Sequence, residues 1–219
     1  MMMIRFAAAP AMLLAAVPAL AQVVPAPVST PATTTPPTTP TPATVRVVMT
    51  TSAGPIVLAL EKDRAPVTTA NFLRYVDAKR FDGIAFYRSM RLPWNSGLIQ
   101  AGQRDQAKLF KPIAHEPTST TGLSHTEGAI SMARLAPGTA TADFSIVVGD
   151  MTGLDAKTPE TGGDPGFAVF GRVVEGMDVV KTIWMAPRSA TKGEGVMKGE
   201  MLEPQVRILT VRRVPVAKP

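Results

Sequence analysis

Arg88 is the residue in this sequence best suited to chemistry at a fixed point. It lies in the stretch 81–102, FDGIAFYRSMRLPWNSGLIQAG, as a charge between two apolar runs. A guanidinium stays protonated and presents several N–H donors in a rigid plane, so it can stabilise electron density that develops on a substrate atom. The alternative is an arginine at the rim of a barrel, with its stem packed and its charged end in water.

Other reactive residue types give weaker indications. The chain has no cysteine, which excludes thiol catalysis, disulfides and a cysteine metal site. His115 and His125 are its two histidines; both lie in polar, loop-like sequence without a GxSxG motif, so a hydrolase is a weak alternative. The glycines of GEGVMKG, at 193–199, have the wrong spacing for a dinucleotide loop. No ligand cluster suggests calcium or zinc, and we expect neither a cofactor nor a metal.

Short apolar strands must position Arg88. One strand is expected around Ile84 and Phe86, and the others are expected at 45–50, 56–60, 98–101, 128–134, 144–150, 166–176 and 205–214. Many short strands with only two helices favour a closed β-barrel over a parallel α/β sheet.

Two helices are expected between these strands. The first begins at Pro66, and its apolar residues at the three-to-four spacing of a buried face are Val67, Ala70, Leu73 and Val76. The second spans 177–186, with Val180 and either Ile183 or Trp184 turned inward.

Several motifs, in this order along the chain, resemble the cyclophilin family of peptidyl-prolyl isomerases. They are TSAGPIVLAL, APVTTANFLRYV, KRFDG followed by FYR, IQAG, GAISMAR and FAVFGRVVEGMDVV. The resemblance covers about residues 45–214. It implies a mainly β fold, an eight-stranded antiparallel closed barrel capped by two α-helices. It also implies catalysis of rotation about X-Pro bonds, with Arg88 as the main catalytic residue.

Rotation about an X-Pro bond requires neither a nucleophile nor a cofactor. Amide resonance imposes a barrier near 20 kcal/mol, and the uncatalysed process takes roughly tens of seconds or more. A catalyst needs an apolar pocket for the proline ring and a fixed donor to the prolyl nitrogen as that nitrogen loses conjugation. Arginine suits this task better than lysine, whose single flexible ammonium is less well oriented.

The resemblance also implies a groove around Arg88. Gln100, in IQAG, matches a glutamine that hydrogen-bonds the substrate backbone, and Met132, in SMAR, matches a methionine that lines the pocket. Ala133 and Arg134 match positions that offer backbone contacts to the residue before proline. Taken alone, Gln100 is equally a polar strand residue and Met132 a core residue.

Other matched positions depart from the family pattern. Leu154 matches a pocket leucine, but Gly153 stands where the family often has Trp or Phe. Phe167 stands where the family has His or Tyr near the substrate. The chain reads ADFSI where the family reads SQFFI, so Asp143 replaces a glutamine and Ser145 replaces a pocket phenylalanine.

The connection after Arg88 is also unusual. SMRLPWNSGLI is about four residues longer than the family's IPGF-type connection, whose phenylalanine floors the proline pocket, and Gly97 or Leu98 falls near that place. One hypothesis is that Trp94 folds back to supply the missing aromatic surface.

These departures leave two classes of function open. A weakened pocket loses about 1 to 3 kcal/mol for each large side chain, which lowers affinity or rate by roughly tens to thousands of fold. The first class is a prolyl isomerase that acts on proline-containing segments of unfolded or exported proteins. The second is a catalytically weak or inactive module that binds a peptide or protein in the same groove.

The N-terminus predicts export. Arg5 is followed by an apolar run, and ALA at 19–21 has the small residues that signal peptidase requires, so residues 1–21 are expected to be a cleavable signal peptide. Residues 22–44 are almost entirely Pro, Thr, Ala and Val and predict a disordered linker. The globular domain is then expected at 45–219, in the bacterial periplasm, with no membrane span after cleavage.

Composition limits the partners. The 219 residues are 45% hydrophobic, enough for one domain with a sizeable core. The formal charge is +6, but the Lys and Arg are scattered without a basic aromatic patch, which argues against nucleic acid as a partner. We expect a monomer.

Overall fold

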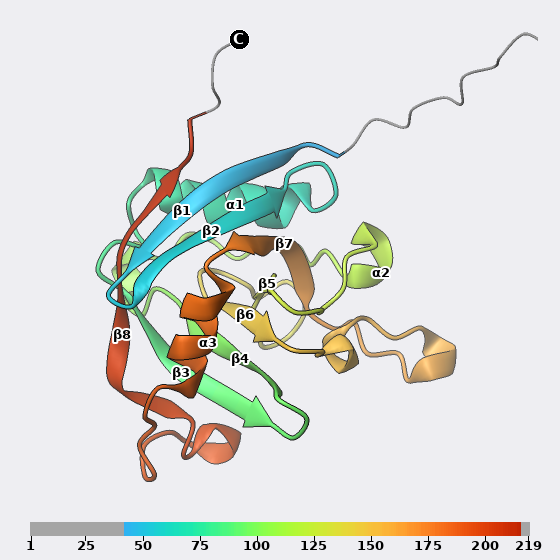
Figure 1. The fold of residues 1–219 in the computed structure, drawn as a ribbon. Helices are drawn as coiled ribbons and strands as arrows, with labels where there is room; N and C mark the ends of the chain where they lie inside the picture. The colour runs from blue at the N-terminus through green and yellow to red at the C-terminus, as the bar shows by residue number, and fades with distance from the viewer. Residues whose placement is uncertain (1–41, 216–219) are drawn as a thin grey trace, which may run out of the picture. The chain divides into compact units, whose positions relative to one another are not determined.

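The computed structural model of the chain describes residues 42–215. The signal peptide expected at 1–21 lies outside the described residues, as does the linker expected at 22–44 except for its last three residues. Eight antiparallel strands close into a barrel in the order β1-β2-β7-β5-β6-β4-β3-β8 (Figure 1). The strands are β1 (Thr44–Thr51), β2 (Gly54–Glu61), β3 (Ala85–Leu92), β4 (Ser96–Ala101), β5 (Ala129–Met132), β6 (Phe144–Val148), β7 (Ala168–Glu175) and β8 (Met201–Arg213).

Three helices accompany the barrel in residues 42–215. They are α1 (Pro66–Asp77), α2 (Thr118–Thr121) and α3 (Met177–Met185), and 3-10 turns form η1 (Gln106–Lys108), η2 (Thr152–Leu154), η3 (Pro159–Thr161) and η4 (Gly195–Met197). The expected barrel and both expected helices are confirmed. The one-turn helix α2 was not expected, because four residues are too few to show a helical period.

Strand β8 begins at Met201, four residues before the expected start. The expected strand followed the alternating pattern, which begins at 205, and the added residues include Pro204, which has no N–H to donate. Between the pair of Phe86 with Val206 and the pair of Arg88 with Met201 the register shifts, because β8 has more residues there than β3 does. The added residues pair Met201 with Arg88.

The buried face of α1 differs from the expected one. Val67 is 41% exposed and Ala70 is also exposed, whereas Phe72 and Tyr75 are fully buried. The prediction is wrong for Val67 and Ala70 because the two large aromatic rings bury more apolar surface and set the rotation of the helix. Helix α3 turns Val180, Ile183 and Trp184 inward as expected.

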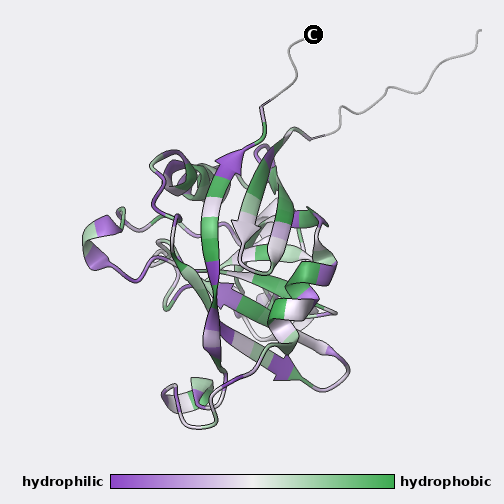
Figure 2. Ribbon diagram, turned by 60° about the vertical axis from the view of Figure 1, so that its left-hand side comes forward, coloured by the Kyte–Doolittle hydropathy of each residue, from purple (hydrophilic) through white to green (hydrophobic). Residues whose placement is uncertain are grey.

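Aromatic side chains fill the interior of the barrel. The ring of Phe72 lies 4.9 Å from Phe81, 5.4 Å from Phe144 and 5.3 Å from Phe170, measured between centroids. Hydrophobic and hydrophilic residues alternate along β8 (Figure 2), so that strand offers one face to this core and one to the outside. All residues of β5 and β6 are buried. Burial of each large apolar side chain stabilises the fold by about 1.5 to 3 kcal/mol.

Candidate active site

A row of polar residues crosses four neighbouring strands on the outer face of the barrel. Arg88 on β3 lies opposite Gln100 on β4, Gln100 lies opposite Ser145 on β6, and Ser145 lies opposite Ser131 on β5. Directly opposed residues of antiparallel strands point to the same face. The neighbouring residue Phe144 is fully buried in the core, so Ser145 and the rest of the row point outward.

A cavity of about 280 Å³ lies over this row. It is lined by seven of the residues expected in the site: Arg88, Gln100, Ala133, Arg134, Ser145, Leu154 and Phe167. An eighth, Asp143, lines a neighbouring cavity of about 360 Å³ that shares Gln100, Ala133 and Arg134 with the first. These two adjoining cavities, which together we call the groove, bring together eight of the nine residues expected in the site.

Met132 is the exception among the expected site residues. Its side chain is 2% exposed and belongs to the hydrophobic core, and it lines neither cavity of the groove. The expectation that Met132 lines the pocket is corrected by the alternation of β5, in which the neighbouring Ser131 takes the outward position and reaches the cavity.

The Arg88 guanidinium is held by two oxygens, one from Gln100 on β4 and one from Glu200, the residue before β8. Its Nη1 donates to Gln100 Oε1 at 2.9 Å, and its Nε donates to Glu200 Oε2 at 2.7 Å. Nη2 lies 2.7 Å from the same Glu200 oxygen, and the two side chains are only 13% and 19% exposed. Glu200 was not anticipated, because it lies 112 residues from Arg88 and no local pattern links them.

The hypothesis that Trp94 supplies the missing aromatic wall is wrong. Trp94 is 95% exposed, in the turn between β3 and β4. Trp94 and Asn95 both have positive φ, 64° and 54°, as in the two-residue turns of tight hairpins, and this turn leaves the indole in solvent.

Aliphatic and thioether side chains line the groove together with Phe167. Met90 and Leu98, which pair across β3 and β4, reach the cavity from one hairpin. Met197, from η4, reaches it from a distant segment and also lines the neighbouring cavity. Met90 and Leu98 stand near Arg88 in sequence and follow from the strand alternation, whereas Met197 has no local signal.

Arg134 contributes its side chain to the wall, in addition to the backbone contacts expected of it. Its guanidinium carbon lies 4.9 Å from the centroid of the Phe167 ring. Its Nε donates to the carbonyl of Gly166 at 3.0 Å, and Nη2 donates to the same oxygen. A cation placed over a ring in this way fixes the orientation of both side chains.

Asp143 is held between a tyrosine and an arginine. Tyr87 donates its hydroxyl hydrogen to Asp143 Oδ2 at 2.8 Å, and Arg104 Nη1 donates to the same oxygen at 3.2 Å. Burial raises the pKa of Asp143 above its ordinary value, and the hydrogen bonds from Tyr87 and Arg104 act against that rise. Burial, followed by the Asp143 charge, also raises the pKa of Tyr87.

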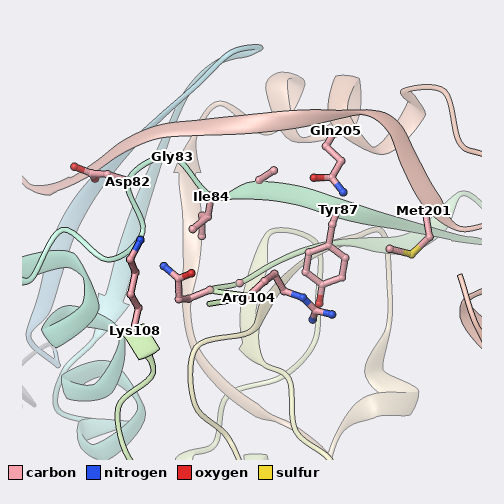
Figure 3. A pocket seen from close by; sticks show the side chains of 11 residues that line it. Asp82, Gly83, Ile84, Tyr87, Arg104, Lys108, Met201 and Gln205 are labelled. Carbon is pink, nitrogen blue, oxygen red and sulfur yellow. The ribbon is translucent and has the colours of Figure 1, made fainter. Parts of the chain in front are cut away.

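A further cavity, of about 440 Å³, opens on the other side of Tyr87 and Arg104. Figure 3 shows these two side chains beside Met201 and Gln205, with Lys108 and Asp82 at the far end. Its lining shares Tyr87, Arg104 and Met201 with the Asp143 cavity but does not include Arg88. Of these three cavities, Arg88 lines only the one of about 280 Å³.

His125 is a buried structural residue. The view of both histidines as ordinary loop residues is corrected for His125, which is in a loop but fully buried. Its Nδ1 lies 2.5 Å from Asp155 Oδ1 and its Nε2 lies 2.9 Å from Ser131 Oγ. Burial lowers the pKa of His125, while Asp155 acts in the opposite direction. The hydrogen bonds that join Ser131, His125 and Asp155 have the connectivity of a hydrolase triad. Ser131, however, is only 2% exposed and lies at the deep end of the cavity, which argues against a hydrolase.

The described part of the chain offers neither a metal site nor a membrane helix. Residues 42–215 contain no group of three or more His, Cys, Asp and Glu side chains placed to hold a metal ion. In the same residues no helix has the length and apolar character needed to cross a membrane.

Comparison with known proteins gives a consistent result. The sequence profile of the family described as "Cyclophilin type peptidyl-prolyl cis-trans isomerase/CLD" matches residues 46–213. The chain is similar to a peptidyl-prolyl cis-trans isomerase of Streptomyces antibioticus, with 38% identity over 67% of this chain and 87% of the relative. It is also similar to peptidyl-prolyl cis-trans isomerase B of Escherichia coli, with 37% identity over 63% of this chain and 82% of the relative.

Among solved structures, the fold is similar to that of a cyclophilin type peptidyl-prolyl cis-trans isomerase of Cryptosporidium parvum, determined in the presence of the dipeptide Ala-Pro. The TM-score is 0.60 at 18% identity, and the match covers 78% of this chain and 99% of the other. At this identity the likeness shows the fold.

Proposed function

The chain belongs to the cyclophilin-type peptidyl-prolyl cis-trans isomerase family, and from this premise we propose that it accelerates rotation about X-Pro bonds with Arg88 as the donor to the prolyl nitrogen. The single observation that carries the proposal is the outward row of Arg88, Gln100 and Ser145 beneath a cavity walled by Met90, Leu98, Met197, Leu154 and Phe167. The row supplies a fixed cation, and the walls supply apolar surface for a proline ring.

The proposed mechanism is electrostatic. As the X-Pro bond twists, amide resonance is lost and a lone pair localises on the prolyl nitrogen. A hydrogen bond from the Arg88 guanidinium to that nitrogen is stronger in the twisted state than in either planar state, so it lowers the barrier. Gln100 holds Nη1 of Arg88, which reduces the freedom that the guanidinium loses when substrate binds. No bond to the enzyme forms and no proton is transferred.

Measuring exchange and binding separately tests the proposal. The purified protein is mixed with Ala-X-Pro-Phe peptides, and cis/trans exchange is followed by NMR while binding is followed from chemical-shift changes of the protein. We expect both binding and faster exchange. Binding without faster exchange would contradict the proposal and identify the groove as a peptide-binding module, a role that the loss of the pocket phenylalanine at Ser145 would explain.

We further propose that the chain acts as a monomer on proline-containing segments of exported proteins. The apolar run and small residues at 1–21, followed by the Pro/Thr-rich stretch at 22–44, support export to the periplasm. Intact mass of the protein recovered from the periplasm of a bacterial host is expected to correspond to a chain that begins at Gln22. A chain that keeps residues 1–21 would contradict the export proposal, and light scattering that gives twice the mass of one chain would contradict the monomer.

A further inference from the structure

The segment between α3 and β8, residues 186–200, is fixed against the strand that carries Arg88. Ser89 donates its backbone N–H to the carbonyl of Glu200 at 2.9 Å, and Arg188 Nη1 donates to the carbonyl of Ser89 at 3.2 Å. Ser189 donates its backbone N–H to the carbonyl of Met201 at 2.8 Å. These contacts, together with the pairing of Arg88 with Met201, place Glu200 beside Arg88.

Glu200 contacts Arg88 without entering the groove. One oxygen, Oε2, accepts from Nε of Arg88 and lies at the same distance from Nη2, so one edge of the guanidinium faces the carboxylate. Arg88 and Gln100 line the cavity over the polar row, but Glu200 lines neither that cavity nor the Asp143 cavity. The carboxylate is therefore placed to orient the arginine and not to contact a peptide in either cavity.

Orientation of Arg88 has an energetic consequence. A free arginine side chain loses rotamer entropy when it is fixed. A charge-assisted hydrogen bond between two side chains that are 13% and 19% exposed fixes it before substrate binds. Gln100 holds Nη1 from the opposite strand, so the guanidinium is fixed between β4 and the start of β8.

We propose that Glu200 is a positioning residue for isomerisation, which holds the Arg88 guanidinium in the orientation that donates to the prolyl nitrogen. The inference rests on the proposed function of Arg88 and adds a residue to it. The segment at 186–200 would then have a role in the reaction, because it places the Glu200 carboxylate beside Arg88.

The test compares Glu200→Ala and Glu200→Gln with a matched control, Glu203→Gln. Glu203 lies on β8, three residues beyond Glu200, and pairs with Lys192 in an exposed ion pair. Neither residue of that pair lines the groove. We expect Glu200→Ala to lower kcat/KM for X-Pro exchange by about 10- to 100-fold, the cost of a misplaced catalytic group. Glu200→Gln keeps one oxygen acceptor and is expected to lose less, within about 10-fold. Glu203→Gln should match the wild type.

Two further readouts separate positioning from a general effect on the fold. Formate added to Glu200→Ala is expected to restore part of the rate, because a small carboxylate can occupy the vacated place beside Arg88, and to leave Glu203→Gln unchanged. The Nε–H of Arg88, observed by ¹⁵N NMR, is expected to exchange slowly with water in the wild type and in Glu203→Gln, and rapidly in Glu200→Ala.

The outcomes distinguish the two proposals. A Glu200→Ala rate equal to or above that of the wild type would overturn the positioning role, as would an Arg88 Nε–H whose exchange is unaffected by the substitution. If the wild type itself does not accelerate exchange, the isomerase proposal fails, whereas the Nε–H measurement still decides whether Glu200 orients Arg88. Loss of rate in Glu200→Ala with no rescue by formate and slow Nε–H exchange would assign the effect to the fold and reject the positioning role.

Discussion

The inner and outer faces of this barrel are formed by the same strands but carry different kinds of side chain. On β6, Phe144 points inward and packs edge-on against Phe72, with 5.4 Å between the ring centroids, while the adjacent Ser145 points outward into the groove. The interior is filled by rigid aromatic rings. The groove is walled by flexible side chains such as Met90 and Met197 around a fixed arginine.

The difference indicates that stability and recognition are carried by opposite faces of the sheet. A core residue is surrounded by neighbours that cannot relax fully when it is truncated, so its loss leaves a cavity. A methionine at the groove adapts to what binds there and contributes mainly to affinity. Substitutions on the two faces should therefore separate unfolding free energy from catalytic rate.

The largest expected effect is in the core, where helix α1 packs against the inner face of the barrel. Phe72→Ala removes a fully buried ring that contacts three other rings, and should lower the free energy of unfolding by about 3 to 5 kcal/mol in urea titrations. Val67→Ala, on the exposed side of the same helix, serves as the control and should cost under about 0.5 kcal/mol. Equal losses for the two variants would contradict the assignment of the core.

His125 connects the two faces, because it is buried and hydrogen-bonded to Ser131 at the floor of the cavity. Its pKa is lowered by burial, so the unfolded chain binds a proton at a higher pH than the folded chain does. The free energy of unfolding should therefore rise with pH from the folded pKa up to about 6.5, and this stability should be lost as the pH falls through that window.

The variant His125→Gln should cost about 1 to 3 kcal/mol at pH 7 through lost hydrogen bonds. It should also remove the part of the pH dependence that His125 contributes, seen as the difference between wild-type and variant unfolding free energies from pH 5 to 7.5. A difference that does not change with pH would show that His125 does not titrate differently in the two states.

A smaller effect is expected for the groove wall. Met197→Ala removes part of the apolar surface of both cavities and should raise KM for X-Pro peptides by about 5-fold, the equivalent of about 1 kcal/mol of burial, with little change in stability. Val196→Ala, next to it and 87% exposed, should leave KM unchanged. Equal KM values for the two variants would contradict the assignment of Met197 to the binding surface.

The smallest effect is expected at the hairpin tip. Trp94→Ala should change the unfolding free energy by less than about 0.5 kcal/mol and leave the exchange rate as it is, because the indole is 95% exposed. Titration with urea and peptide exchange by NMR measure both quantities. A clear loss of exchange would revive the hypothesis that this ring covers the proline.

The spacing of apolar residues and short motifs in the sequence predicted the strands, the two main helices and the residues around Arg88. Alternating strands, the helix start at Pro66 and the motifs around Arg88 and Gln100 led to the barrel and to most of the groove. The face of α1 was partly wrong because the spacing treated Val67 as equal to Phe72, although the ring buries far more surface.

Contacts made across long separations could not be predicted in this way. Met197 reaches the groove, and Glu200 reaches Arg88, from a segment about a hundred residues beyond Arg88. Only the register of β8 against β3 brings that segment there. The burial of His125 was missed because nothing nearby in the sequence indicates Asp155 as its partner.

The most direct test of the central claim is the exchange rate of Ala-X-Pro-Phe peptides measured by NMR with the wild type, Arg88→Ala and Arg88→Lys, alongside urea unfolding of each. Removal of one preorganised donor lowers a rate by about 100- to 1000-fold, so we predict a loss of that size for Arg88→Ala and a substantial loss for Arg88→Lys, while both variants remain folded. An Arg88→Ala protein that remains folded and accelerates exchange as fast as the wild type would contradict the account.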